Sequence, residues 1–143
     1  WTCYREKGYW RTRTVIYNLT NLFLVAAGGA FGASLRHLTS IFFKYFFYYS
    51  FFGTLVVNVL GSFFIGLFIY LLQNKSLSQD LIRYFFIVGV LGSYTTFSAF
   101  SFETIDLLIN KKLLLSFIYI ILSLLLCLIA AYVGLNINKI LNW

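Results

Sequence analysis

Long apolar runs separated by short polar segments dominate this chain of 143 residues. The runs cover residues 22–43, 52–72, 84–110 and 113–135, and each is about as long as the 20 residues that a membrane-spanning helix needs. A spanning segment must pair its own backbone groups, which favours helices. The pattern predicts an all-α membrane protein with four transmembrane helices in one domain, residues 22–143, after a basic N-terminal tail, residues 1–21.

The third apolar run is interrupted by a cluster of hydroxyl residues. Its members are Ser93, Tyr94, Thr95, Thr96 and Ser98. Hydroxyls at neighbouring positions point all round a helix, so this stretch must be enclosed by protein or line a wet cavity. We therefore predict a broken third helix. The chain has no proline, so Gly92 is expected to supply the backbone freedom, and the released carbonyls can hold an ion.

Two other runs carry polar residues at spacings that place them on one helix face. The second run has Thr54, Asn58 and Ser62, and the fourth has Tyr119, Ser123 and Cys127, in each case four residues apart. Together with the interrupted third run, these two stripes predict a shared polar path through the membrane.

The amino-acid composition argues against several classes of protein function. The apolar share of 61%, the charged share of 10% and the mean hydropathy of +0.86 leave no room for a soluble catalytic domain. The net charge of +7 is scattered between the apolar runs, so nucleic-acid binding is not expected. Neither a nucleophile with a base nor a metal-binding spacing is evident, which indicates that the protein is not an enzyme.

Basic residues outside the runs bear on orientation. The side of the N-terminus has Lys75, Arg83 and Lys139, and the other side has Lys44, Lys111 and Lys112. Because the two sides carry equal numbers of these basic residues, the positive-inside rule predicts no preferred orientation, and a core of this kind should insert both ways. The tail adds Arg5, Lys7, Arg11 and Arg13, which would favour a cytoplasmic N-terminus. We expect the tail either to be absent from the working protein or to be overridden during insertion.

Three local patterns now coincide. They are Gly28-Gly29-x-x-Gly32-Ala33-x-x-Arg36, then Gly53-Thr54-Leu55-x-Val57-Asn58-x-x-Gly61-x-Phe63-x-x-Gly66, then Gly92-x-x-Thr95-Thr96-Phe97-Ser98-x-Phe100. Together they resemble the Fluc (CrcB) family of fluoride channels over about residues 22–135. Ser93, where many members have a second glycine, and Cys127, where a hydroxyl is often found, depart from the family pattern.

The resemblance implies a passive fluoride exporter that relieves fluoride toxicity from the cell inner membrane or plasma membrane. It implies an antiparallel, dual-topology homodimer in membrane lipid, with two pores and a central structural sodium ion held by the backbone carbonyls of Gly92 and Thr95. The pore positions that it implies are Phe97, Phe100, Asn58, Thr54, Ser98, Tyr119, Ser123 and, in the vestibule, Arg36.

These residue types suit fluoride, which is small and strongly hydrated. A selective pore must replace its water with donors, such as the amide of Asn58 and the hydroxyls of Thr54, Ser98 and Ser123. A phenylalanine ring has a positive edge, so Phe97 and Phe100 can meet an anion without a full charge that would trap it. Arg36 would raise the local anion concentration.

Each position also has a purely structural interpretation. The two phenylalanines and the stripe from Tyr119 can be helix packing, Asn58 can be an interhelical hydrogen bond, and Arg36 can reach water from the end of a span. His37 is expected at the interface. Glu103 and Asp106 suit a gating or cation-attracting pair, but the favoured interpretation is helix-end carboxylates that reach water.

Two rival functions remain open from sequence alone. A small multidrug-resistance transporter that couples cation export to protons is also a four-span antiparallel dimer, but it needs a membrane-embedded carboxylate, which the first run lacks. A membrane subunit that scaffolds a larger complex would show no ion flux by itself.

Overall fold

The computed structural model describes residues 19–47, 51–73, 79–137 and 139. The predicted tail, apart from residues 19–21, lies outside the described residues. Within them are four helices long and apolar enough to cross a membrane. These are α1 (Leu19–Phe46), α2 (Phe51–Gln73), a composite third span (Leu81–Ile109) and α5 (Leu113–Leu135). The prediction of an all-α protein with four apolar spans is confirmed, although α1 begins and ends about three residues outside the predicted run.

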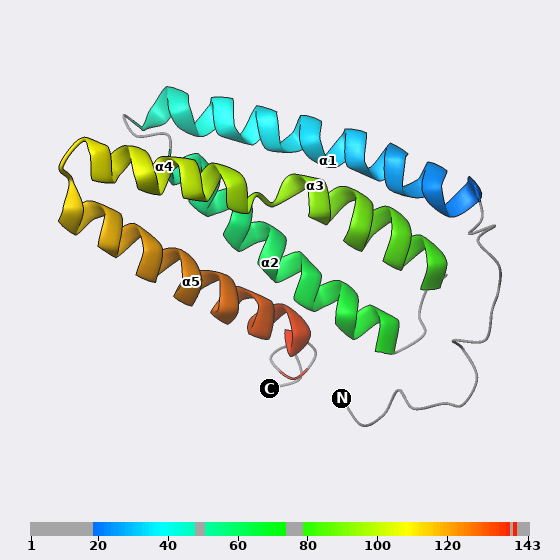
Figure 1. Cartoon of the computed structure of the whole chain (residues 1–143). Coiled ribbons are helices and arrows are strands. Elements are labelled where there is room, and N and C mark those ends of the chain that lie inside the picture. The colour runs from blue at the N-terminus through cyan, green and yellow to red at the C-terminus, as the bar shows by residue number, and fades with distance from the viewer. Residues whose placement is uncertain (1–18, 48–50, 74–78, 138, 140–143) are drawn as a thin grey trace, which may run out of the picture.

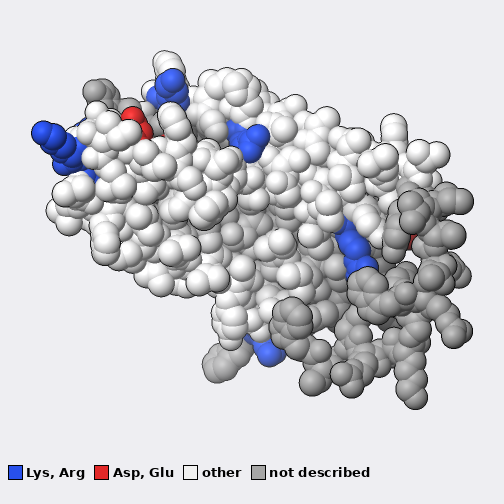
Figure 2. Space-filling model, in the orientation of Figure 1, with Lys and Arg blue, Asp and Glu red and all other residues white. Residues whose placement is uncertain are grey.

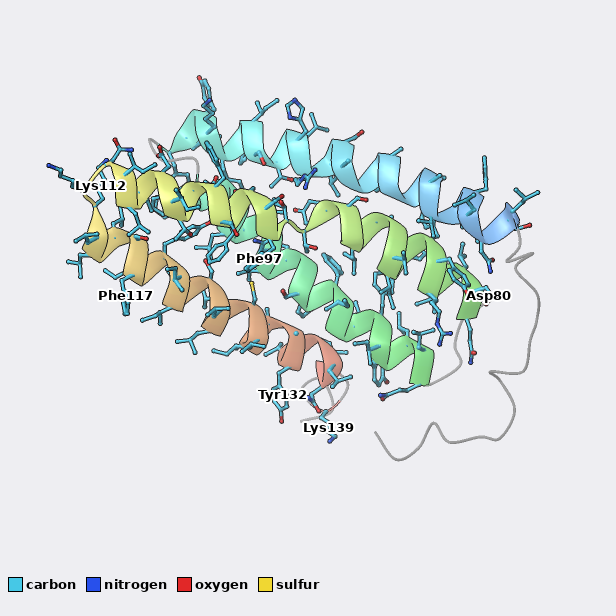
Figure 3. All side chains as sticks on the ribbon, viewed as in Figure 1. Asp80, Phe97, Lys112, Phe117, Tyr132 and Lys139 are labelled. Atoms are coloured by element: carbon cyan, nitrogen blue, oxygen red, sulfur yellow. The ribbon has the colours of Figure 1, made fainter. Side chains whose placement is uncertain are left out.

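The four spans run up and down beside one another (Figure 1). The first helix, α1, packs along the first half of the third span, whereas α2 packs mainly against α5. Figure 3 places Lys112, in the turn before α5, at one end of the bundle, and Asp80 and Lys139 at the other. The visible surface carries only a few scattered charges among otherwise uncharged residues, as a lipid-facing surface requires (Figure 2).

Glycines allow two of these helix pairs to approach closely. A Cβ atom at Gly32 would collide with the carbonyl oxygen of Val90, and one at Gly28 would lie 2.5 Å from that of Phe85. A Cβ at Gly134 of α5 would likewise collide with the carbonyl oxygen of Phe63 in α2. The motif glycines therefore bring backbones into direct contact, which is how membrane helices associate without a hydrophobic driving force.

The third span is built from three helical pieces. It begins with a wide π-helix, η2 (Leu81–Leu91), and continues through α3 (Gly92–Tyr94) to α4 (Phe97–Ile109). The N–H of Gly92 donates to the carbonyl of Ile87, five residues back, as in a π-helix. Apolar residues occupy nearly every position of η2, so no period in the sequence distinguishes this wide helix from an α-helix.

Two residues with extended backbone separate α3 from α4. Thr95 has φ −72° and ψ 151°, and Thr96 has φ −149° and ψ 112°. Thr96 is the N-cap of α4, since its Oγ1 accepts a hydrogen bond of 3.2 Å from the N–H of Ala99. The predicted role of Gly92 is wrong: with φ −60° and ψ −30° it is ordinary right-handed helix. A capping threonine, rather than glycine freedom, starts the new helix.

Candidate functional site

The larger cavity of the site has a volume of about 400 Å³ and lies where the extended pair faces α2 and α5. Its lining brings together residues from three spans that the sequence suggested separately. From α2 come Asn58 and Ser62, from the third span Gly92, Thr95, Thr96, Phe97 and Phe100, and from α5 Ser123 and Cys127. The rest of the lining is mainly aliphatic. A few polar groups in an apolar cavity can orient a small ligand without holding it tightly.

The side chain of Asn58 both accepts a hydrogen bond from the extended backbone of Thr96 and donates one to it. Its Oδ1 accepts from the N–H of Thr96 at 2.8 Å, and its Nδ2 donates to the carbonyl of the same residue at 3.1 Å. A helix interruption at membrane depth leaves backbone groups that lipid cannot satisfy, and this side chain satisfies one of each kind. Gly61 makes room for the arrangement, since a Cβ there would collide with the Cγ2 of Thr95.

The hydrogen bonds of the extended pair deprive two backbone carbonyls of the donors that a continuous helix would give them. In a continuous α-helix the N–H of Thr96 would donate to Gly92 and that of Ala99 to Thr95. Here the N–H of Thr96 goes to Asn58 and that of Ala99 to the Oγ1 of Thr96. The carbonyls of Gly92 and Thr95 therefore lose the donors that an uninterrupted helix would supply. Hard oxygen atoms released in this way suit a hard cation.

The two phenylalanines of the third motif have different surroundings. Phe97 is 75% exposed in the single chain, and Figure 3 shows it beside the link between α3 and α4. Phe100 is buried, with its ring centroid 5.4 Å from that of Phe97 and 5.1 Å from that of Tyr119. Both line the larger cavity, and the buried ring is held at a fixed angle by its aromatic neighbour.

The sequence-based interpretation of Glu103 is also wrong. Instead of reaching water, it is half-buried and accepts two hydrogen bonds of 2.9 Å, from Thr54 Oγ1 to Oε1 and from Tyr119 Oη to Oε2. A carboxylate inside a bundle needs donors of this kind. The predicted pore residues Thr54 and Tyr119 thus converge on a carboxylate, while Asp106 is exposed, as expected for a residue near a helix end.

A smaller cavity of about 190 Å³ lies on the α1 side of the extended pair. Arg36 and His37 of α1 line it together with Thr54 of α2 and Thr96. Thr96 lines both cavities, so the extended pair lies between them. Arg36 is half-buried, and it is the cationic side chain that reaches the smaller cavity along with the exposed ring of His37.

The last two predicted residues carry hydroxyls. Ser98 is exposed, with its hydroxyl 3.1 Å from Thr96 Oγ1. Ser123 is only 6% exposed and lines the larger cavity, yet its buried hydroxyl oxygen has no hydrogen-bond partner among the residues that the structure describes. Sequence reasoning missed the side chain of Thr96, although threonine is among the residue types preferred at a helix N-cap. Within the described ranges, no group of three His, Cys, Asp or Glu residues could hold a metal.

Comparison with known proteins identifies the family of this chain. The family model described as "CrcB-like protein, Camphor Resistance (CrcB)" matches residues 23–135. A protein of Flavobacterium psychrophilum named "Fluoride-specific ion channel FluC" is 40% identical over 122 residues, covering 85% of this chain and 98% of its own.

Two further relatives carry the same name. One from Campylobacter jejuni is 48% identical over 122 residues, covering 85% of this chain and 99% of its own. One from Shewanella sp. is 48% identical over 117 residues, covering 81% and 94%. The matches extend over all four apolar helices, and the chain therefore belongs to the CrcB-like family and is a multi-pass membrane protein.

Proposed function

We propose that this protein is a fluoride channel that lets fluoride leave the cytoplasm passively, and that it is not an enzyme. The observation that supports the proposal is the larger cavity. It collects an amide, several hydroxyl residues and two aromatic rings from three spans, in a chain whose relatives are named fluoride channels. The donors are small and uncharged. Such a lining can replace the water of a small anion without a fixed cation that would retain it.

Each lining residue has a distinct part in this proposal. The Asn58 amide has two N–H bonds, of which Thr96 uses one, so the other is available to an ion in the cavity. The Ser123 hydroxyl has no partner within the described chain and can donate as well. The rings of Phe97 and Phe100 then offer their positive edges. The smaller cavity, with Arg36, is the vestibule that concentrates anions before they reach the extended pair.

Fluoride efflux from liposomes containing the purified protein tests this function. We expect rapid fluoride efflux and no comparable chloride efflux, because the cavity offers hard donors and ring edges instead of fixed positive charge. A fluoride-selective electrode follows the first ion, and a chloride electrode follows the second under the same gradient. Proton-driven export of organic cations would instead support the multidrug-transporter alternative, and the absence of any flux would support a scaffolding subunit.

We also propose that the third span works as a broken helix inside a homodimer. Phe97, Ser98 and Gly92 are exposed in the single chain although they lie in the middle of a membrane span. Polar backbone and hydroxyl groups at that depth are not tolerated against lipid, so they need cover by protein. A second copy seated over this face would provide that cover and would close the open side of the larger cavity.

Sodium is the proposed structural ion of that dimer. The carbonyls of Gly92 and Thr95, which have lost their helical donors, would hold it together with the same pair from the second subunit. Bound there, the ion would offset the repulsion between carbonyl oxygens that face one another in an interface without water. The chain's own residues keep the carbonyls available, since Asn58 and Thr96 occupy the competing N–H groups.

Removing sodium is expected to weaken the dimer. A ligand that binds only the assembled state stabilises it by about 2.7 kcal/mol at a concentration 100 times its Kd, and this contribution disappears when the ion is withdrawn. The dimer fraction and the fluoride flux are measured in sodium and in N-methylglucamine at equal ionic strength. If both quantities were the same in the two salts, a backbone sodium site would be untenable.

Dual topology is proposed for the same dimer, in antiparallel arrangement. Outside the tail and the apolar runs, basic residues number three at each end, and Figure 3 shows Lys112 and Lys139 at opposite ends. Lys75 and the tail lie outside the described residues.

Topology reporters on the full-length chain and on a chain without residues 1–18 test this arrangement. The deleted form is expected to show both orientations in comparable amounts, because charge bias is then absent. One orientation only, with fluoride flux retained, would contradict the antiparallel dimer.

A further inference from the structure

Cys127 contributes a thiol to the lining of the larger cavity. It lies near the middle of α5 (Leu113–Leu135), is half-buried and makes no disulfide. It lines the larger cavity together with Asn58, Phe97 and Phe100. A thiol in this position contacts the space through which the proposed ion path runs.

A second polar group of the cavity lining is the hydroxyl of Ser123. Ser123 lies four residues before Cys127 on the same face of α5, about 5–6 Å away between Cβ atoms by helix geometry. The residue is only 6% exposed, and its hydroxyl oxygen makes no hydrogen bond within the described part of the chain. An unpaired buried hydroxyl costs free energy until something occupies the cavity beside it. The thiol and the hydroxyl therefore offer a sulfur and an oxygen to one small occupant.

We propose that Cys127 is a binding site for a soft, thiophilic monovalent metal ion, and that such an ion blocks the channel from within the cavity. Soft metal ions prefer thiolate sulfur to the oxygen and nitrogen groups that line the rest of the cavity. Binding breaks the S–H bond, forms a sulfur–metal bond and releases the proton to water, with no change of oxidation state. Silver(I) is the probe, and Ser123 Oγ is its neighbouring oxygen.

A metal ion bound at Cys127 obstructs fluoride in two ways. It occupies part of a cavity of about 400 Å³ whose other lining is largely apolar. It also replaces the small thiol proton by a much larger silver atom, which crowds the donors beside it, while the silver thiolate itself carries no net charge. This inference rests on the proposed channel function, because the block is measured as a loss of fluoride flux.

The experiment compares wild-type protein with variants of its two cysteines. The matched control is Cys3→Ser, since Cys3 is the other cysteine of the chain and lies outside the described residues. Cys127→Ser and Cys127→Ala both remove the thiol, and two variants are used because either alone could disturb folding. Fluoride efflux from liposomes is recorded in nitrate buffer with and without micromolar silver, and each protein is normalised to its own flux without silver.

Silver is expected to reduce flux at least about tenfold in the wild type and in Cys3→Ser, with recovery after a thiol chelator is added, because the bound silver obstructs the cavity that the ion must cross. Both Cys127 variants should keep their own flux. Equal block of the Cys127 variants, or no block of the wild type, would overturn the proposal.

Mass spectrometry of silver-treated protein separates the two hypotheses. Silver on Cys127 in a protein without flux would count against the channel function and support the metal site. Conducting protein without silver on Cys127 would count against the metal site alone. If neither Cys127 variant conducts, the wild type is alkylated with and without silver. Protection of Cys127 from alkylation by silver would support the metal site, and absence of protection would overturn the proposal.

Discussion

Replacing both Phe97 and Phe100 by isoleucine is expected to reduce fluoride flux at least about thirtyfold. Isoleucine keeps much of the apolar volume but removes the ring edges, and two edge contacts of about 1 kcal/mol each correspond to a change of that size. The two rings line the same cavity with their centroids 5.4 Å apart, so one ion can interact with both. Fluoride efflux from liposomes measures the loss.

Phe117→Ile is the matched control for this pair. Phe117 lies on α5, is exposed, and points away from the bundle in Figure 3. The control should conduct like the wild type, since it changes the same side chain outside the site. Undiminished flux in the double variant would mean that the rings are packing residues only.

Replacing Asn58 by leucine is expected to remove both flux and much of the stability. Leucine has nearly the same shape but leaves the N–H and the carbonyl of Thr96 without their partner. Each buried group left unpaired costs about 1–3 kcal/mol, and lipid supplies no substitute. We therefore expect a loss of about 2–6 kcal/mol, visible as a lower unfolding temperature in detergent and as little folded protein after purification.

A graded variant and a control sharpen this test. Asn58→Asp keeps an acceptor for the N–H of Thr96 but loses the donor to its carbonyl, so its stability should fall between those of the wild type and Asn58→Leu. Asn110→Leu makes the same change at an exposed asparagine whose amide donates to Asp106, one turn away on the same helix. If Asn58→Leu were as stable as Asn110→Leu, the pairing with Thr96 would not hold the extended segment in place.

Local patterns in the sequence were sufficient to predict the four spans, and they placed Asn58, Ser62, Ser123 and Cys127, which line the larger cavity, on two polar stripes. Hydropathy acts on each segment separately, because every spanning helix must be apolar over its own length. The spacing of Asn58, Ser123 and their neighbours on single helix faces likewise follows from local geometry. The motif glycines at Gly28 and Gly32 could be assigned to helix contacts for the same reason.

The partners of the polar groups were decided only by the tertiary structure. Thr54 and Glu103 are separated by 49 positions, and Asn58 and Thr96 by 38, so no local pattern pairs them. Glu103 was therefore assigned to water from its place near a helix end, although two hydroxyls from other helices hold it inside. Gly92 was expected to supply the backbone freedom for the helix break. That freedom is unnecessary, because Thr96 caps α4 and its backbone is hydrogen-bonded to Asn58. At membrane depth each polar group must find a protein partner, and which partner it finds depends on how the helices pack.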